Sequence, residues 1–234
     1  LMLRNIVIDG NSAAGATGVS SEGNGSGGSL IGVFDGSALT VGEGAVVQNN
    51  SIESHGNWYP EGGGGIFTKM STVNIEGGTV CNNEAVYGGG VFGISDAVIN
   101  VSSGSVTGNR ALQGANPRLS AEYGGSGGGI CAADGTDVNV SGGTISHNAA
   151  YERGGGISMG TLFASEKDSP VLTMTGGTVS SNSAGAGGGG IFVQAGYSAS
   201  GHSGTPTYGI AQITAGTIEG NEVTAEGEGS AMFG

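Results

Sequence analysis

The chain has 234 residues, of which 53 are glycine, and it carries a formal net charge of −13 with only 6 lysine and arginine residues. So few cations exclude nucleic acid as a partner and argue against an anionic lipid surface. A hydrophobic fraction of 36% is too high for a disordered chain, and no apolar run reaches the length of a membrane-spanning helix.

An eight-residue block occurs six times along the chain and predicts two strand segments joined by a glycine turn. Its first, third and eighth residues are apolar, and its second and fourth are mostly polar. This alternation is typical of a strand with one buried face, and glycine permits the bend between the two segments. The copies span residues 39–46, 73–80, 99–106, 138–145, 172–179 and 211–218.

An asparagine follows each block, three residues after its last apolar position. Asparagine tolerates left-handed backbone and bonds to nearby backbone, and its side chains can also bond to one another when stacked on successive coils. The predicted ladder consists of Asn49, Asn83, Asn109, Asn148, Asn182 and Asn221. The matching inward column is Val46, Val80, Val106, Ile145, Val179 and Ile218.

A second block, in which glycines precede an aliphatic residue, supplies a further strand. Its inward residues are Ile66, Val91, Ile130, Ile157 and Ile191. Equal blocks joined by unequal loops are typical of a solenoid. We therefore predict an all-β, right-handed parallel β-helix of about six to seven three-strand coils with an asparagine ladder, forming one domain over residues 1–234.

The cysteines and the end of the chain give two further expectations. Cys81 and Cys131 occupy different places in the repeat, so no disulfide is predicted. Residues 227–233 repeat the opening of a coil, and we expect a fragment of a longer surface protein, with end-to-end self-association through open strand edges.

Three coils resemble a known repeat: VCNNEAVYGGGV at 80–91, ISHNAAYERGGGI at 145–157 and VSSNSAGAGGGGI at 179–191. They are similar to the paired GGA[ILV] and FxxN motifs of chlamydial polymorphic outer membrane proteins and related bacterial, autotransporter-passenger-like adhesins. The chain departs by using GGG for GGA and Val or Ile for Phe. The segment LRNIVIDGN at 3–11 resembles a coil of the broader pectate-lyase-like superfamily. The resemblance implies an extracellular adhesin, displayed at the cell surface, that binds a host or environmental glycan or protein.

Aromatic residues gather beside the glycine-led strands and predict a ligand-binding groove. Rings one place after the inward aliphatic residue should point outward, where they can stack on sugar rings. The candidates are Trp58, Tyr59, Phe67, Tyr87, Phe92, Tyr123, Tyr151 and Phe192. The alternative is that these rings pack on each other and cover the glycine-rich corner.

The alternative function is a carbohydrate-active enzyme, a glycosidase or polysaccharide lyase with loop-borne carboxylates, because pectin-processing enzymes share this fold. His202 lies in the nearest approach to a Gly-His-Gly motif, but no aspartate pair accompanies it. His55 and His147 are expected to be structural or solvated. Asp134 and Asp137 are the candidate oxygen ligands for Ca²⁺, and no other cofactor is expected. No catalytic residue is assigned, and the sequence favours binding over hydrolysis.

An outward column of hydroxyl side chains is a third feature: Thr79, Ser105, Thr144, Thr178 and Thr217. Such a column is typical of ice-binding surfaces, but its neighbour column is too irregular for a flat array. Exposed strands favour threonine in any case.

Overall fold

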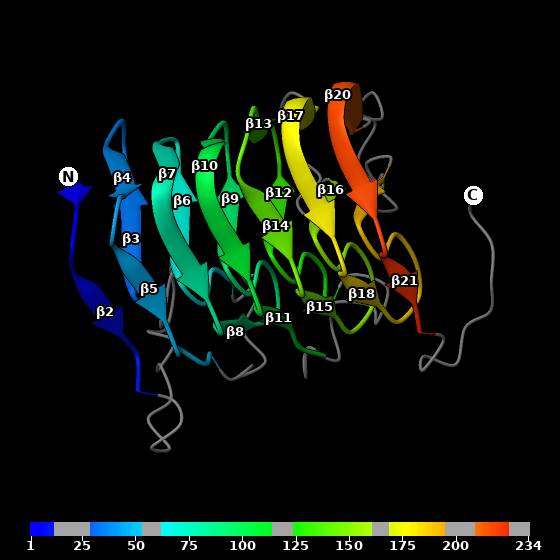
Figure 1. The fold of residues 1–234 in the computed structure, drawn as a ribbon, viewed down its shortest axis with the longest axis horizontal. Helices are drawn as coiled ribbons and strands as arrows, with labels where there is room; N and C mark the ends of the chain where they lie inside the picture. Colours follow the sequence, from blue (N-terminus) through cyan, green and yellow to red (C-terminus); the bar gives the residue numbers. More distant parts are fainter. Residues whose placement is uncertain (12–28, 53–61, 114–123, 161–168, 195–208, 225–234) are drawn as a thin grey trace, which may run out of the picture.

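The computed structural model describes residues 1–11, 29–52, 62–113, 124–160, 169–194 and 209–224. Within these ranges the strands form three sheets, and the strand pairs are parallel. Equivalent strands follow one another along the long axis from the N-terminal to the C-terminal end (Figure 1). The predicted all-β, parallel β-helix is therefore confirmed. No helix in the described ranges is long and apolar enough to cross a membrane.

The ten-stranded sheet is built from the eight-residue blocks. In four coils one long strand runs through the whole block: β7 (Thr72–Cys81), β10 (Val98–Thr107), β17 (Val171–Ser180) and β20 (Ile210–Glu219). In the other two coils the block is divided into two strands: β4 (Ala38–Gly42) with β5 (Val46–Gln48), and β13 (Asp137–Val140) with β14 (Thr144–Ser146). Two strands before the first block, β1 (Met2–Leu3) and β2 (Val7–Asp9), pair with β4 and β5 in the same sheet.

The other two sheets complete each coil. The six-stranded sheet holds the glycine-led strands: β3 (Ile31–Phe34), β6 (Ile66–Lys69), β9 (Val91–Ile94), β12 (Ile130–Ala133), β16 (Ile157–Gly160) and β19 (Ile191–Val193). The five-stranded sheet holds two-residue strands directly after the ladder: β8 (Glu84–Ala85), β11 (Arg110–Ala111), β15 (Ala149–Ala150), β18 (Ser183–Ala184) and β21 (Glu222–Val223). Ala111, Ala150 and Ala184 of these short strands form a small cluster of their own.

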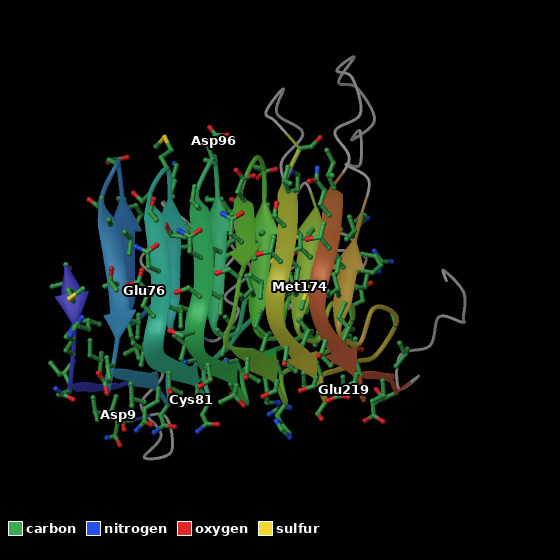
Figure 2. All side chains as sticks on the ribbon, turned by 45° about the horizontal axis from the view of Figure 1, so that its top comes forward. Asp9, Glu76, Cys81, Asp96, Met174 and Glu219 are labelled. Carbon is green, nitrogen blue, oxygen red and sulfur yellow. The ribbon has the colours of Figure 1, made fainter. Side chains whose placement is uncertain are left out.

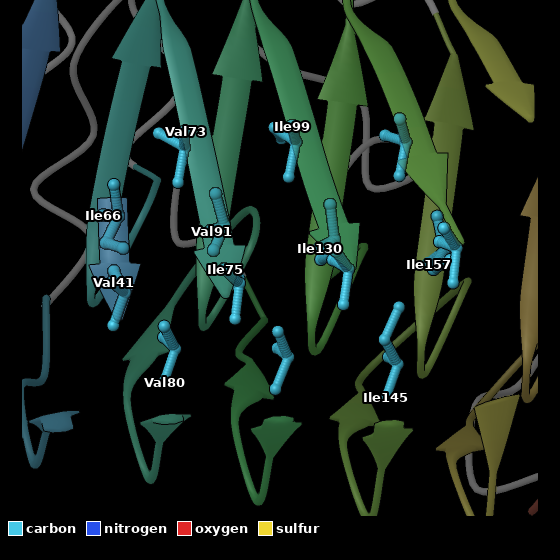
Figure 3. Close-up of a cluster of buried hydrophobic side chains, with 14 of the residues drawn as sticks. Val41, Ile66, Val73, Ile75, Val80, Val91, Ile99, Ile130, Ile145 and Ile157 are labelled. Carbon is cyan, nitrogen blue, oxygen red and sulfur yellow. The ribbon is translucent and has the colours of Figure 1, made fainter. Parts of the chain in front are cut away.

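The hydrophobic core lies between the ten-stranded and six-stranded sheets (Figure 3). Identical positions of successive coils pair in register: Val73 with Leu39 and Ile99, and Val106 with Val80 and Ile145. Because no single coil can bury its apolar face alone, this stacking is what makes the core. The inward columns predicted from the sequence are confirmed, apart from one residue.

That residue is Val46. The prediction for Asn49 has the same one-residue error. Val47, not Val46, pairs with Val80 and is 0% exposed. The glycine turn of this coil holds one extra residue, so the strand after it is shifted by one. Because the sequence has two successive valines and two successive asparagines here, the pattern alone cannot detect the shift. Asn50 is consequently the buried ladder residue, and the prediction of Asn49 is wrong.

Asn49 instead occupies the corner before the ladder, with a φ of 58°. Asn82, His147 and Ser181 adopt the same left-handed conformation at the equivalent place. The Asn49 side chain donates to the Asp9 carboxylate at 3.1 Å, and the Gln48 amide donates to the same oxygen at 2.7 Å. The bond from Gln48 is the largest of several hydrogen bonds that hold the Asp9 pKa below the usual range of an aspartate.

The buried ladder has the same hydrogen bonds at successive rungs. The Asn83 backbone N–H and Nδ2 both donate to Asn109 Oδ1, at 3.0 and 3.1 Å. Asn83 Nδ2 also donates to the Val47 carbonyl at 3.1 Å, which ties the rung to the preceding strand. The rungs are Asn50, Asn83, Asn109, Asn148, Asn182 and Asn221.

Each position of the GGG block requires glycine for a different physical reason, as residues 127–129 illustrate. Gly127 has a φ of +72°, which disfavours other residues. A Cβ on Gly128 would collide with the Ala149 carbonyl oxygen, and one on Gly129 would lie 2.9 Å from Asn148 Nδ2. The third glycine of each block faces a ladder asparagine in the same way: Gly65, Gly90, Gly129, Gly156 and Gly190. An alanine at this place, as in the GGA motif, has no room beside the ladder.

Candidate binding surfaces

The aromatic residues of the N-terminal half form a second buried cluster. Phe67 and Phe92 are 0% exposed and Tyr87 is 1% exposed. The Phe67 and Phe92 ring centroids lie 5.7 Å apart, and the Tyr87 ring stacks on Phe92 at 5.9 Å. Val86, Ile94, Cys131 and Ala133 complete this cluster. The expectation of an exposed groove floor is wrong for these three rings, because they cover the glycine-rich corner and each other, as the alternative held.

The remaining described candidates lie farther along the solenoid. Tyr151 is 46% exposed, and Phe192 of β19 is half-buried. The Arg153 guanidinium lies over the Phe192 ring, 5.3 Å from its centroid, and Nη1 donates to Gln194 Oε1 at 3.4 Å. Trp58, Tyr59 and Tyr123 lie outside the described residues, as do His55 and His202.

The acidic and histidine candidates differ in burial. Asp134 is 2% exposed in the turn after β12, whereas Asp137 begins β13 and is half-buried. In the parts of the chain that the structure describes, no group of three His, Cys, Asp or Glu side chains is placed to hold a metal ion. His147 is exposed at the left-handed corner before the ladder. Ca²⁺ binding by Asp134 and Asp137 stays a prediction.

The two cysteines are free thiols, as expected. Burial, followed by the negative charge of Asp134, raises the pKa of the Cys131 thiol far above its usual value. Burial also raises the Cys81 pKa, with a smaller contribution from Asp9. Neither thiol therefore has the lowered pKa of a reactive cysteine.

A row of polar side chains on the outside of the ten-stranded sheet was missed by the sequence analysis. It occupies the second place of each eight-residue block, between two inward residues. Asn100 Nδ2 donates to Asn74 Oδ1 at 2.8 Å, and Asn139 Nδ2 donates to Asn100 Oδ1 at 2.9 Å. This outer amide row comprises Thr40, Asn74, Asn100, Asn139, Thr173 and Gln212.

The hydroxyl column predicted from the sequence lies in the same sheet, beyond the bend of each block. Ser105 pairs with Thr79 and Thr144, and its hydroxyl donates to Thr79 at 3.2 Å. We refer to this column, Thr79, Ser105, Thr144, Thr178 and Thr217, as the hydroxyl row. The two rows together are called the outer polar face.

The outer polar face is uncharged along both rows, and its side chains are half-buried except at the last coil. Charges of both signs border it: Arg4 Nε lies 3.2 Å from Met2 Sδ, and Met2 pairs with Thr40 at the N-terminal end of the outer amide row. Glu76 is exposed on β7 between the two rows, and Glu219 lies at the end of β20 (Figure 2). The outer amide row could have been found from the second place of each block, which is polar in all six copies.

No family model, curated protein or solved structure matches the chain. The parallel β-helix is thus established by its own strand pairing and buried ladder, and the candidate surfaces by the side-chain contacts described above.

Proposed function

We propose that the chain is a non-catalytic segment of a bacterial, cell-surface adhesin, which binds a glycan or a protein in the extracellular space. The observation that carries this proposal is the outer polar face, where half-buried polar side chains recur on successive strands with their amides held by one another. Ligand binding to side chains that are already ordered loses less conformational entropy than binding to mobile ones. A solenoid repeats such a surface over several coils, which favours extended partners.

The resemblance of the ladder and glycine blocks to adhesin repeats supports the same class of function. Fewer of the predicted aromatic side chains are exposed for ligand binding than the sequence suggested. Among the described candidates, Tyr151 is exposed and Phe192 is half-buried, while the three N-terminal rings are packed inside their own cluster.

The test is to incubate the folded chain with a panel of soluble glycans, insoluble polysaccharides and immobilised surface proteins. Retention of the chain with no release of sugar supports the proposal. Release of reducing sugar or of an unsaturated product supports the enzyme alternative and overturns ours. Retention equal to that of the heat-denatured chain on every member of the panel also overturns it.

A further inference from the structure

We propose that the outer polar face is the binding site and that its ligand is an extended, neutral polysaccharide lying along the axis of the solenoid. This inference rests on the proposed function and names both the surface and the class of ligand. It places recognition on the ten-stranded sheet and not at the aromatic residues.

The hydrogen-bonding capacity of the amide row selects for hydroxyl groups. A side-chain amide has two N–H donors and an oxygen that accepts two bonds. Asn100 uses one donor toward Asn74 and one acceptor site toward Asn139, both within the row. One donor and one acceptor of that amide are left for another partner. A sugar hydroxyl both donates and accepts, so it matches such a pair, whereas a sulfate or carboxylate only accepts.

The charge of the surface points in the same direction. Both rows are uncharged, and acidic residues border them: Glu76 between the rows, Asp137 beside Asn139 on β13, and Glu219 at the end of β20. The cation Arg4 lies beside Met2, which precedes Thr40 at the N-terminal end of the amide row. The whole chain carries a net charge of −13. An anionic polymer would meet this field without a cation in either row, and repulsion would oppose its binding. A neutral polymer avoids that cost.

The geometry favours a polymer over a single sugar. The outer amide row crosses successive parallel strands, which lie about 4.8 Å apart. From Thr40 to Gln212 the register makes five steps, so the row extends about 24 Å. Each further coil offers another hydrogen-bond donor and acceptor to the same polysaccharide molecule, and several linked contacts raise the overall affinity. Retention is therefore expected to increase with the length of the oligosaccharide until it spans the row.

The test uses the triple variant Asn74→Ala, Asn100→Ala and Asn139→Ala, whose side chains point away from the core. The probes are an insoluble β-linked glucan, a xylan, an oligosaccharide length series, and pectate as the anionic polymer. We expect roughly tenfold or greater loss of affinity for the neutral polymer, since several hydrogen bonds are removed together. Retention by the unmodified chain should change little with salt, because no ion pair is involved.

Two controls separate this inference from loss of fold and from binding at the aromatic residues. The variant Asn100→Thr keeps a hydroxyl of the kind that Thr40 and Thr173 already provide in the row, so it should lose less affinity than the triple variant. Tyr151→Ala removes the exposed ring, so binding should be unchanged. Circular dichroism of each variant establishes that the fold is intact.

The outcomes distinguish the two proposals. If the triple variant binds as well as the unmodified chain, or if Tyr151→Ala alone abolishes binding, the outer polar face is not the site, although an adhesin function stands. Preference for pectate, or for an immobilised protein over every glycan, overturns the assignment of a neutral polysaccharide. Absence of retention on the whole panel overturns both proposals.

Discussion

Removal of one rung of the buried ladder should destabilise the fold far more than removal of a chemically identical residue outside it. Asn109 is 0% exposed, and its side chain takes part in four hydrogen bonds. It accepts from the Asn83 backbone N–H and Nδ2, and it donates to the Val80 carbonyl and to Asn148 Oδ1. Asn109→Ala therefore removes partners from several buried groups at once.

The magnitude follows from those groups. A buried donor or acceptor left without a partner costs about 1–3 kcal/mol. With the Asn83 N–H and the Val80 carbonyl both affected, we expect Asn109→Ala to lower the free energy of unfolding by about 3–5 kcal/mol. Asn100→Ala is the matched control, since it removes two side-chain hydrogen bonds on the half-buried outer row. Water can replace these bonds, so its cost should be about 1 kcal/mol or less.

Urea unfolding followed by far-ultraviolet circular dichroism compares the two variants, and hydrogen exchange localises the effect. Faster exchange in Asn109→Ala should concentrate in the coils beside residue 109, because each coil of a solenoid contacts only its neighbours. If the two variants were destabilised equally, the buried ladder would not stabilise the fold more than the outer amide row does. The cost assigned to buried groups without a partner would then be wrong.

Three further predictions concern a glycine of the GGG block, the two thiols and Asp9. Gly129→Ala should destabilise the chain by about 1–3 kcal/mol in urea unfolding, because its new Cβ lies 2.7 Å from the Gly156 carbonyl oxygen, whereas Gly160→Ala makes ordinary contacts and should be close to neutral. With a thiol reagent near neutral pH, Cys81 should react more slowly than a free cysteine and Cys131 should react only on unfolding, since both thiols have a raised pKa; rapid labelling of both in the folded chain would contradict this. The pKa of Asp9 is lowered by folding, so its stabilising contribution is present at neutral pH and is lost as the pH falls from the ordinary aspartate range through the folded-state pKa. An NMR titration should give an Asp9 pKa below that of a model peptide, and Asp9→Asn should remove the corresponding acid-dependent change in the N-terminal coil; an unshifted titration would refute the assigned hydrogen bonds.

Much of the fold was predictable because the coils repeat. The GGG strands, the inward columns apart from Val46, and five of the six ladder residues were placed from the sequence. Asn49 failed because one extra residue in the preceding turn shifts the strand by a single position, and adjacent valines and asparagines fit either register. The pairing of Val47 with Val80 decides between them. The two-residue strands after the ladder were also missed, since two residues are too few for a period of two to be read.

At the candidate binding surfaces, the alternation of polar and apolar residues predicted less than it did for the core. Alternation correctly indicated that Phe67 and Phe92 point away from the core, but it could not indicate whether anything covers them. In the structure they pack with Tyr87, Cys131 and other side chains into a second apolar cluster. In the same way, the polar second place of each block was visible, yet the hydrogen bonds between Asn74, Asn100 and Asn139 exist only because successive strands are in register.

The sequence by itself therefore determined which residues face the core and that the coils stack, because both follow from a period of two repeated in equal blocks. The tertiary structure alone decided the register of the irregular coil, the burial of the outward rings and the alignment of the outer amides. These depend on contacts between segments that lie far apart in the sequence, such as Val47 with Val80, Phe67 with Phe92, and Asn100 with Asn74. Local sequence constrains each partner of such a contact but not the distance between them.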